Sequence, residues 1–398
     1  MPTDESTSTR RATLKYGAAA AASGLLAGCA GTTDEAGTST SPSTATDTGS
    51  YTVEMFPVGE VAFDEVPETW MATYRDAWGD MAVALGQADG NRSSTLYRLG
   101  QWYDLLGIEY DSDHPDTWQN GAFDKEVYYE LDCDVHLMDP NDVAASEGLD
   151  EADVEEIAES VGPFFGSFIR RYNSQFQTDL NYAENAPTML EAFEKVGEVF
   201  QEGERARAFL DLHDEVQTEV ESRMEGVEPV EIGLLNGGSD ASEGLFYALD
   251  PTSRGYEMKH FRDIGVENAF EGVETGQYGE TDYETLLEVD PDVIVYHSSI
   301  STDFSGYWDP ESFRERRIEA MEAHEVGQNL TAVQNGNVYP GGYYEQGPIV
   351  SLFSLELAGQ TLYPEQFGEF PIDQYPEVPE ENRLFDRQRV ADIVNGDI

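Results

Sequence analysis

Short apolar runs alternate with stretches of helical periodicity from Tyr51 to the end of the chain. Short runs of apolar and β-branched residues predict strands, whereas apolar residues spaced three to four positions apart predict amphipathic helices. Their alternation is typical of βα units built around parallel sheets, so we expect an α/β fold. The predicted strands are 69–74, 135–138, 231–236 and 293–297, and the predicted helices include 78–85, 151–160 and 283–288.

One segment in the middle of the chain continues the helical period for much longer. From Thr188 to Met224 the 3.6-residue period persists with no proline after Pro187. This pattern predicts a helix of about 55 Å at 1.5 Å per residue. Gly197 and Gly203 weaken the prediction and indicate a possible bend.

The length of the chain requires more than one lobe. The 348 residues from 51 to 398 exceed what one hydrophobic core usually holds. We therefore predict an N-terminal lobe over 51–187, a linking helix over 188–226 and a C-terminal lobe over 227–398.

An internal repeat supports two similar lobes. Residues 124–135 read DKEVYYELDCDV and residues 282–293 read DYETLLEVDPDV, a constant offset of 158 residues with six identities in twelve positions. Each copy predicts a short amphipathic helix, a tight turn and a buried strand. Duplicated units on either side of the long segment indicate two related α/β lobes.

The N-terminal residues are typical of an export signal. Arg10 and Arg11 precede an apolar stretch over 16–28, whose 13 residues are too few to span a bilayer. The arginine pair resembles a twin-arginine signal, and Leu-Ala-Gly-Cys ending at Cys29 resembles a lipobox. We predict a signal peptide over 1–29, lipid attachment at Cys29 and a position on the outer face of the cytoplasmic membrane.

Composition narrows the choice of partners. Residues 30–50 are almost wholly Ser, Thr, Gly, Ala and Asp, which predicts a flexible tether. The chain has 79 acidic against 22 basic residues and a net charge of −57, which disfavours nucleic acid and anionic membrane surfaces as partners. Evenly spread acids over an ordinary apolar fraction resemble the proteins of salt-loving archaea, where molar salt screens charge repulsion. With Cys29 lipidated, Cys133 has no disulfide partner and is expected to be a buried thiol.

At this point the sequence resembles a known family. The run YETLLEVDPDVIVY at 283–296, the segment LEAFEKVGEVFQEGERARAFLD at 190–211 and NLTAVQNGNVYP at 329–340 resemble elements of the periplasmic binding proteins for iron-siderophores, haem and cobalamin. The resemblance implies two α/β lobes joined by a helix, a ligand cleft between them, and delivery of the ligand to an ABC permease and its ATPase. It further implies a monomer that is not an enzyme and binds a small metal chelate.

Cation and aromatic side chains at the ends of predicted strands are the candidate ligand contacts. Binding in open α/β lobes occurs beyond the carboxyl ends of parallel strands. Arginine offers a planar fork for oxyanions, and aromatic rings offer flat apolar contact. The candidates are Tyr74, Arg75, Trp78, Trp118, Arg254, Tyr256, Tyr343 and Tyr344.

Two further residues follow from the resemblance alone. In the family, one glutamate on each lobe docks on arginines of the permease, and the repeat places these at Glu126 and Glu284. First-turn acids are also favoured simply by the helix dipole.

The sequence predicts that the protein is not an enzyme, whereas the identity of its ligand stays open. No nucleophile elbow, phosphate-binding loop, dinucleotide fingerprint or zinc signature is present, and we expect no cofactor and no resident metal. We expect an Fe(III) chelate of siderophore type as ligand. The alternatives are haem, cobalamin or a molybdate-type oxyanion on the same fold, or a secreted lipid-anchored hydrolase.

Overall fold

The computed structural model describes residues 49–398 apart from 74–76, 112, 116–117, 120–121, 147, 301–306 and 344, together with the side chains of 94, 95, 97, 118, 119 and 277. The predicted signal peptide, Cys29 and nearly all of the predicted tether therefore lie outside the described residues, as do Tyr74, Arg75 and Tyr344.

The N-terminal lobe is built on a short parallel sheet. Strand β3 pairs in parallel with β6, and parallel bridges from Trp70 to Asn91 and from His136 to Phe164 extend this sheet on both sides. The strands are β1 (Tyr51–Met55), β2 (Gly59–Phe63), β3 (Trp70–Ala72), β4 (Trp118–Gln119), β5 (Ala122–Phe123) and β6 (Val135–Leu137). The helices are α1 (Trp78–Ala84), α2 (Gly100–Leu106), α3 (Lys125–Leu131), α4 (Pro140–Ala145), α5 (Glu151–Ser160), α6 (Gln175–Asp179) and α7 (Tyr182–Asn185), with 3₁₀ turns at Ala88–Gly90 and Ser94–Leu99.

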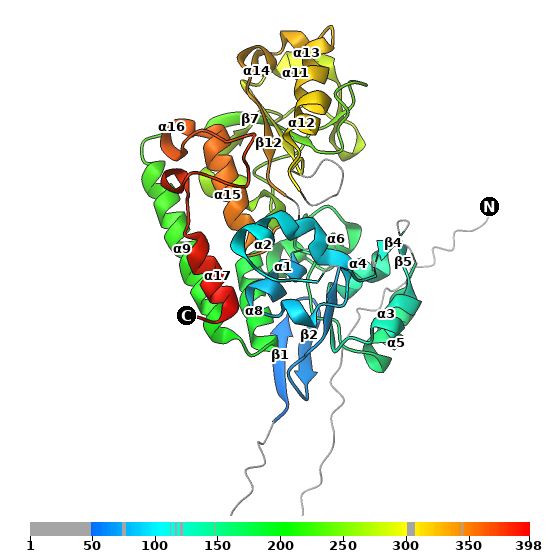
Figure 1. Cartoon of the computed structure of the whole chain (residues 1–398). Helices are drawn as coiled ribbons and strands as arrows, with labels where there is room; N and C mark the ends of the chain where they lie inside the picture. The colour runs from blue at the N-terminus through cyan, green and yellow to red at the C-terminus, as the bar shows by residue number, and fades with distance from the viewer. Residues whose placement is uncertain are drawn as a thin grey trace, which may run out of the picture.

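The C-terminal lobe carries a four-stranded parallel sheet in the order β12-β11-β7-β9. Its strands are β7 (Val230–Asn236), β8 (Phe246–Tyr247), β9 (Val266–Asn268), β10 (Glu280–Thr281), β11 (Val293–His297) and β12 (Val338–Gly341). Its helices are α10 (Lys259–Ile264), α11 (Tyr283–Val289), α12 (Pro310–Phe313), α13 (Ala320–Ala323), α14 (Thr331–Asn335), α15 (Val350–Leu362), α16 (Pro364–Phe367) and α17 (Arg387–Asn395), with a π-helix at Arg314–Glu319 and 3₁₀ turns at Tyr256–Met258, Gln277–Gly279, Gly327–Asn329 and Glu380–Asn382. The expected α/β fold with parallel sheets is confirmed (Figure 1).

The sequence repeat is also a structural repeat. Asp124 and Asp282 both cap a seven-residue helix, because each side-chain oxygen accepts a hydrogen bond from a first-turn N–H. Each helix ends at an aspartate in the left-handed conformation, with φ of 45° at Asp132 and 44° at Asp290. A fully buried strand, β6 or β11, follows each turn. The repeat therefore marks equivalent units of the two lobes, seen as α3 and α11 in Figure 1.

Cys133, where the second copy has Pro291, lies in the first of these turns. The thiol is 1% exposed, as expected for a core cysteine, and burial raises its pKa to about 12. It is therefore protonated and unreactive at neutral pH.

The single long helix predicted over 188–226 is wrong. The segment forms a hairpin of two helices, α8 (Met189–Val199) and α9 (Gly203–Arg223), with Gln201 at φ 55° in the turn. The helices pack so closely that a Cβ on Gly197 would lie 2.7 Å from the Ala206 Cβ. Phe193 packs edge-to-face on Phe209, so both helices bury the faces that produced the continuous period. Helix α9 contacts both lobes, through α1 and α10.

The predicted extent of the C-terminal lobe also needs correction. Helix α17 packs on α1 and α2 of the N-terminal lobe, although 227–398 was predicted to form one lobe. Asp80 in α1 also accepts hydrogen bonds from the Ile349 and Val350 N–H groups at 2.9 and 3.1 Å, which caps α15 from the other lobe. The lobes are thus joined by α9, by the start of α15 and by α17.

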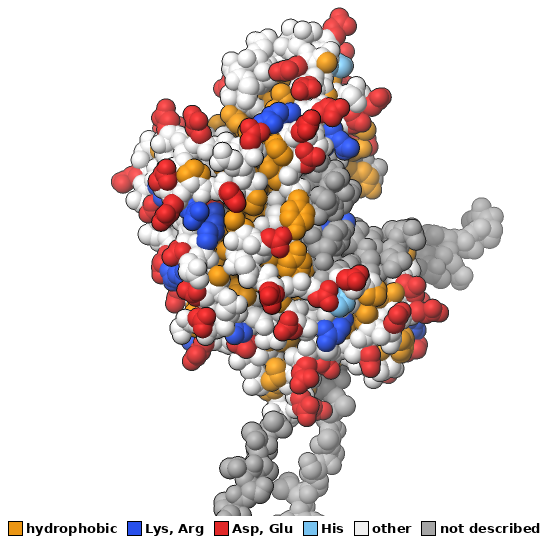
Figure 2. All heavy atoms as spheres, in the orientation of Figure 1, with side chains coloured by type: hydrophobic (Ala, Val, Ile, Leu, Met, Phe, Trp, Pro, Cys, Tyr) orange, Lys and Arg blue, Asp and Glu red, His pale blue; other side chains and the backbone are white. Residues whose placement is uncertain are grey.

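Acidic side chains are spread over the surface of both lobes. Figure 2 shows Asp and Glu scattered over both lobes on the face in view, with apolar side chains between them. This distribution agrees with the even spread of acids along the sequence.

Candidate binding site between the lobes

The carboxyl ends of three C-lobe strands form one wall of the junction between the lobes. Asn236, His297 and Gly341 are register partners at the ends of β7, β11 and β12. Because β9 lies on one side of β7 and β11 on the other, the sheet order reverses between β7 and β11. Such a switch point is where open α/β sheets bind ligands.

The loop after β7 approaches this edge closely. A Cβ on Gly237 would lie 2.7 Å from the His297 carbonyl oxygen, so only glycine fits there. Arg317 donates hydrogen bonds to the carbonyls of Gly237 and Ser239 and lies over the Tyr296 ring at 4.8 Å. The wall is therefore fixed by a buried cation.

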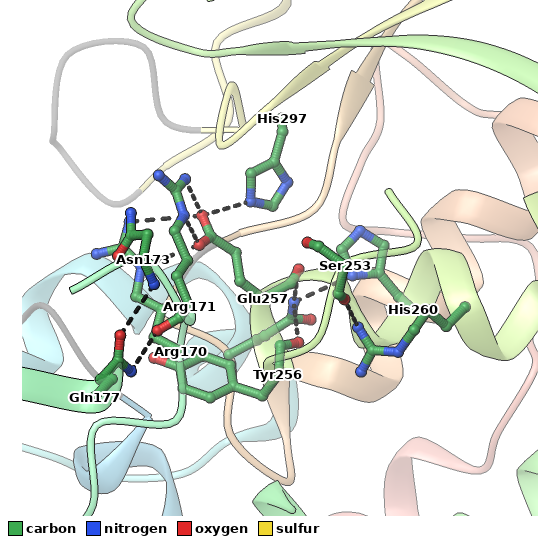
Figure 3. A network of polar contacts seen from close by, with 11 residues as sticks. Arg170, Arg171, Asn173, Gln177, Ser253, Tyr256, Glu257, His260 and His297 are labelled. Carbon is green, nitrogen blue, oxygen red and sulfur yellow. Dashed lines mark hydrogen bonds and ion pairs between the residues drawn. The ribbon is translucent and has the colours of Figure 1, made fainter. Parts of the chain in front are cut away.

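A buried charge network joins the two lobes at this edge; we call Arg170, Arg171, Glu257 and His297 the interlobe network (Figure 3). The Glu257 carboxylate is 0% exposed and accepts from Arg170 Nε at 3.2 Å, from Arg171, and from His297 Nε2 at 3.0 Å. The arginines follow Phe164–Ile169 of the N-terminal lobe, whereas Glu257 and His297 belong to the C-terminal lobe.

The charges in this network decide its protonation. Burial alone would raise the pKa of Glu257, but the arginine charges and the hydrogen bond from His297 hold that pKa well below its usual range. Burial lowers the pKa of His297 even though Glu257 opposes the shift. At neutral pH the network therefore contains one carboxylate, two guanidinium groups and a neutral imidazole, which leaves an excess of positive charge.

Polar side chains after β12 form hydrogen bonds and an ion pair next to the network. Gln346 Nε2 donates to the Glu257 carbonyl at 2.8 Å and to the Tyr256 carbonyl at 3.2 Å. Next to it, Glu345 forms a buried ion pair with Arg98 of the N-terminal lobe at 3.4 Å. The junction thus brings a third arginine from the N-terminal lobe close to the network.

Beside the network lies a cavity of about 410 Å³ whose walls come from both lobes. It is lined by residues 169, 172, 186–190, 254–256, 259, 262 and 263, including Arg254, Lys259 and Arg262, and we call it the cationic pocket. The Tyr256 N–H donates to the Ile169 carbonyl at 3.1 Å, which joins the two walls of this pocket. Gly255 has φ 106°, and a Cβ there would lie 2.1 Å from the Arg170 carbonyl oxygen.

The predicted ligand contacts fall in different places. Trp78 is 0% exposed and packs in the hydrophobic core, and Tyr343 is 1% exposed beside Trp102. Neither ring is open to a ligand in this conformation. Arg254 and Tyr256 both line the cationic pocket, where Arg254 is exposed and Tyr256 is 3% exposed.

The other predicted contacts are not tested. The Trp118 backbone forms β4, but its side chain is outside the described residues, as are Tyr74, Arg75 and Tyr344. Their role as ligand contacts stays a prediction.

Sequence reasoning missed all four residues of the interlobe network. Two signals were present: Arg170 and Arg171 are adjacent cations in a very acidic chain, and His297 ends a predicted strand. Glu257 had no signal, because it is one of 79 acidic residues.

The repeat-related glutamates are both accessible. Glu126 and Glu284 occupy the same first-turn position of α3 and α11, and both are exposed. Their exposure is compatible with docking, and their function stays a prediction.

No group of three or more His, Cys, Asp or Glu side chains in the described part of the chain is arranged to hold a metal ion. Among the helices described, none is both long and apolar enough to cross a membrane.

Comparison with known proteins agrees with this architecture. A family model described as periplasmic binding protein matches residues 168–342, which include the whole interlobe network. A periplasmic binding protein from Veillonella parvula superposes with a TM-score of 0.54 at 16% identity, covering 79% of this chain and 97% of that chain. No curated protein sequence matches the chain.

Two further solved structures have the same fold. The petrobactin-binding protein from Bacillus subtilis has a TM-score of 0.53 at 14% identity, covering 79% of this chain and 99% of that chain. CeuE from Helicobacter pylori with Ni(II) bound has a TM-score of 0.51 at 14% identity, covering 80% and 90%. At such low identities the likeness shows the fold alone.

Proposed function

We propose that this chain is the substrate-binding component of an ABC importer and that its cargo is an iron-siderophore chelate. The fold and the match of residues 168–342 to the periplasmic binding protein family support this proposal. The observation that carries the proposal is the interlobe network at the switch point of the C-lobe sheet. Two arginines from one lobe meet a carboxylate and an imidazole from the other, where the fold places its ligand.

The charge at the junction favours an anionic cargo. Three of the 22 basic residues, Arg98, Arg170 and Arg171, lie at the network or at the Glu345 ion pair. A ferric chelate built from carboxylate, catecholate or hydroxamate oxygens presents the groups that guanidinium forks bind. We infer that these groups compete with Glu257 for Arg170 and Arg171. The petrobactin-binding neighbour supports this class of cargo.

The ligand is tested by titration in molar KCl with tryptophan fluorescence as readout. Ferric hydroxamate and ferric catecholate chelates are compared with the iron-free chelators, haemin, cobalamin and molybdate. We expect binding of a ferric chelate, and a Kd about tenfold weaker in Arg171→Gln, since a hydrogen bond to a charged group contributes ~1.5–3 kcal/mol. Arg389→Gln, which breaks the exposed ion pair with Glu215, is the matched control and should bind like wild type. Binding of haemin, cobalamin or molybdate alone would contradict the iron-siderophore assignment.

Lipid attachment at Cys29 and the tether over 30–50 complete the proposal. A receptor anchored on the outer face of the membrane stays close to its permease, and the tether lets the lobes reach it. The family match, which indicates an extracytoplasmic protein, and the lipobox-like sequence ending at Cys29 support this location.

Docking to the permease is proposed for Glu126 and Glu284. An exposed glutamate paired with a permease arginine supplies orientation and association rate more than affinity. We expect Glu126→Ala or Glu284→Ala to lower transport without changing cargo affinity, and the double variant to lower it further. Glu130→Ala and Glu288→Ala, exposed acids on the same helices, are the controls. Equal loss of uptake in these controls would show that general surface charge is responsible.

A further inference from the structure

The cationic pocket has an unusual balance of charge for this chain. Arg254, Lys259 and Arg262 line it, and Asp263 is the single acid among the lining residues. Lys259 is already ion-paired with Asp263. In a chain with 79 acids and 22 bases, a cavity lined by three cations and one acid is a strong local reversal of sign.

Two of the three cations have no carboxylate partner among the described residues. Arg254 donates to the Ala183 carbonyl and lies over the Tyr172 ring at 5.5 Å. Arg262 donates to the Ser253 carbonyl. Burial lowers the pKa of Arg262, although the nearby charge of Asp263 opposes that shift. The two guanidinium groups therefore face the same cavity, each with only neutral hydrogen-bond acceptors.

The pocket is distinct from the proposed cargo site. None of its lining residues belongs to the interlobe network or to the carboxyl ends of β7, β11 and β12. One wall comes from Tyr172 and from residues 186–190 before and within α8, and the other comes from residues 254–256, 259, 262 and 263.

We propose that the cationic pocket binds a small oxyanion, a phosphate or a carboxylate, which ties the two lobes together independently of the cargo. Guanidinium groups match such anions in a planar, bidentate way that chloride does not offer. In molar salt the Debye length is ~3 Å, so long-range attraction is screened and only direct contacts inside a partly buried pocket retain their strength. A cavity of about 410 Å³ has room for either class of anion.

The test compares wild type with Arg254→Gln/Arg262→Gln in molar KCl. Inorganic phosphate is titrated to millimolar concentration, and binding is measured by calorimetry and by the thermal unfolding midpoint. Phosphate also stabilises proteins by exclusion from their surface, so the difference between variants is the readout. We expect saturable binding in wild type and a Kd at least about tenfold weaker in the double variant, with loss of the specific midpoint shift.

The matched control is Arg92→Gln/Arg383→Gln. These arginines also donate to backbone carbonyls, at 2.9 Å to Asp89 and 3.0 Å to Val378, but neither lines the pocket. The control should respond to phosphate as wild type does. Equal responses in all three proteins, or no saturable binding in any of them, would overturn the proposal.

Two further arms separate this proposal from the cargo assignment. Citrate replaces phosphate to distinguish carboxylate from phosphate recognition, and dependence on the two arginines for either anion supports the proposal. Ferric chelate is then titrated into Arg254→Gln/Arg262→Gln, and unchanged affinity is expected. Loss of chelate binding in this variant would show that the pocket is part of the cargo site. The phosphate result is readable even if no ferric chelate binds.

Discussion

Replacing Glu257 with glutamine is the most informative single change in the interlobe network. The carboxylate is 0% exposed and is shared by Arg170, Arg171 and His297. Glutamine keeps the size of the side chain and one acceptor oxygen but removes the charge. Two guanidinium groups are then left at the junction without their shared counter-ion.

The cost follows from the burial of the network. Breaking a buried ion pair by removing one partner destabilises a protein by about 3–5 kcal/mol, because the remaining charge is uncompensated. Arg170 and Arg171 keep side-chain exposures of 16% and 27%, so water offsets part of that loss. We therefore expect Glu257→Gln to lower the free energy of unfolding by about 3 kcal/mol, the lower end of that range.

Urea unfolding in molar KCl measures this difference without changing ionic strength. Tryptophan fluorescence and far-ultraviolet circular dichroism are followed together, so that an intermediate with separated lobes is detected. Glu215→Gln is the control, because its pair with Arg389 has side-chain exposures of 62% and 38% and should contribute less than about 1 kcal/mol. A Glu257→Gln protein as stable as this control would refute the description of a buried interlobe charge network.

Three other predictions concern the proposed lipid anchor, the rigidity of the lobe junction and a buried histidine. Cys29→Ser should release the protein into the medium with its fold intact; retention in the membrane fraction after a salt wash would refute lipid anchoring. Cargo should change the radius of gyration in solution scattering by less than about 3%, because α9, α15 and α17 all join the lobes, and a large decrease would refute this rigidity. Burial lowers the pKa of His136 to about 3 in the folded protein. As the pH falls below about 6.5, the imidazole is therefore protonated in the unfolded state but not in the folded state, and the folded state loses stability. Between about pH 7 and 5 the free energy of unfolding should therefore decrease by about 2 kcal/mol more in wild type than in His136→Phe. Urea unfolding measures both proteins at both pH values, and an equal decrease in the two proteins would contradict this prediction.

The sequence predicts the repeated units of the fold well. Strand 293–297 and helix 151–160 have the bounds that the sequence indicates, because a fully buried strand reads as an apolar run and Asp150 caps the helix. The strand expected at 69–74 is shorter, spanning Trp70–Ala72. The repeat predicted equivalent units because its aspartates cap the start of each helix and form the turn after it, and these local structures need no tertiary contact.

Longer-range features were not predictable in the same way. The α8–α9 hairpin keeps one helical period across its turn, so periodicity alone cannot reveal that the chain reverses at Gln201. Glu257 gains its role only from arginines that fold from the other lobe. The cationic pocket likewise combines segments 169–190 and 254–263, which are far apart in sequence. Sites built between lobes depend on packing that no local pattern records.

Native mass spectrometry of the protein purified from its iron-limited host tests the proposed function most directly. The account predicts a population that carries one additional mass equal to an iron chelate, and this mass should be lost when the iron is reduced and removed. Arg171→Gln protein purified in the same way should carry less of it. A co-purified haem, corrinoid or molybdate, or a protein that carries no ligand and binds no ferric chelate, would contradict the account.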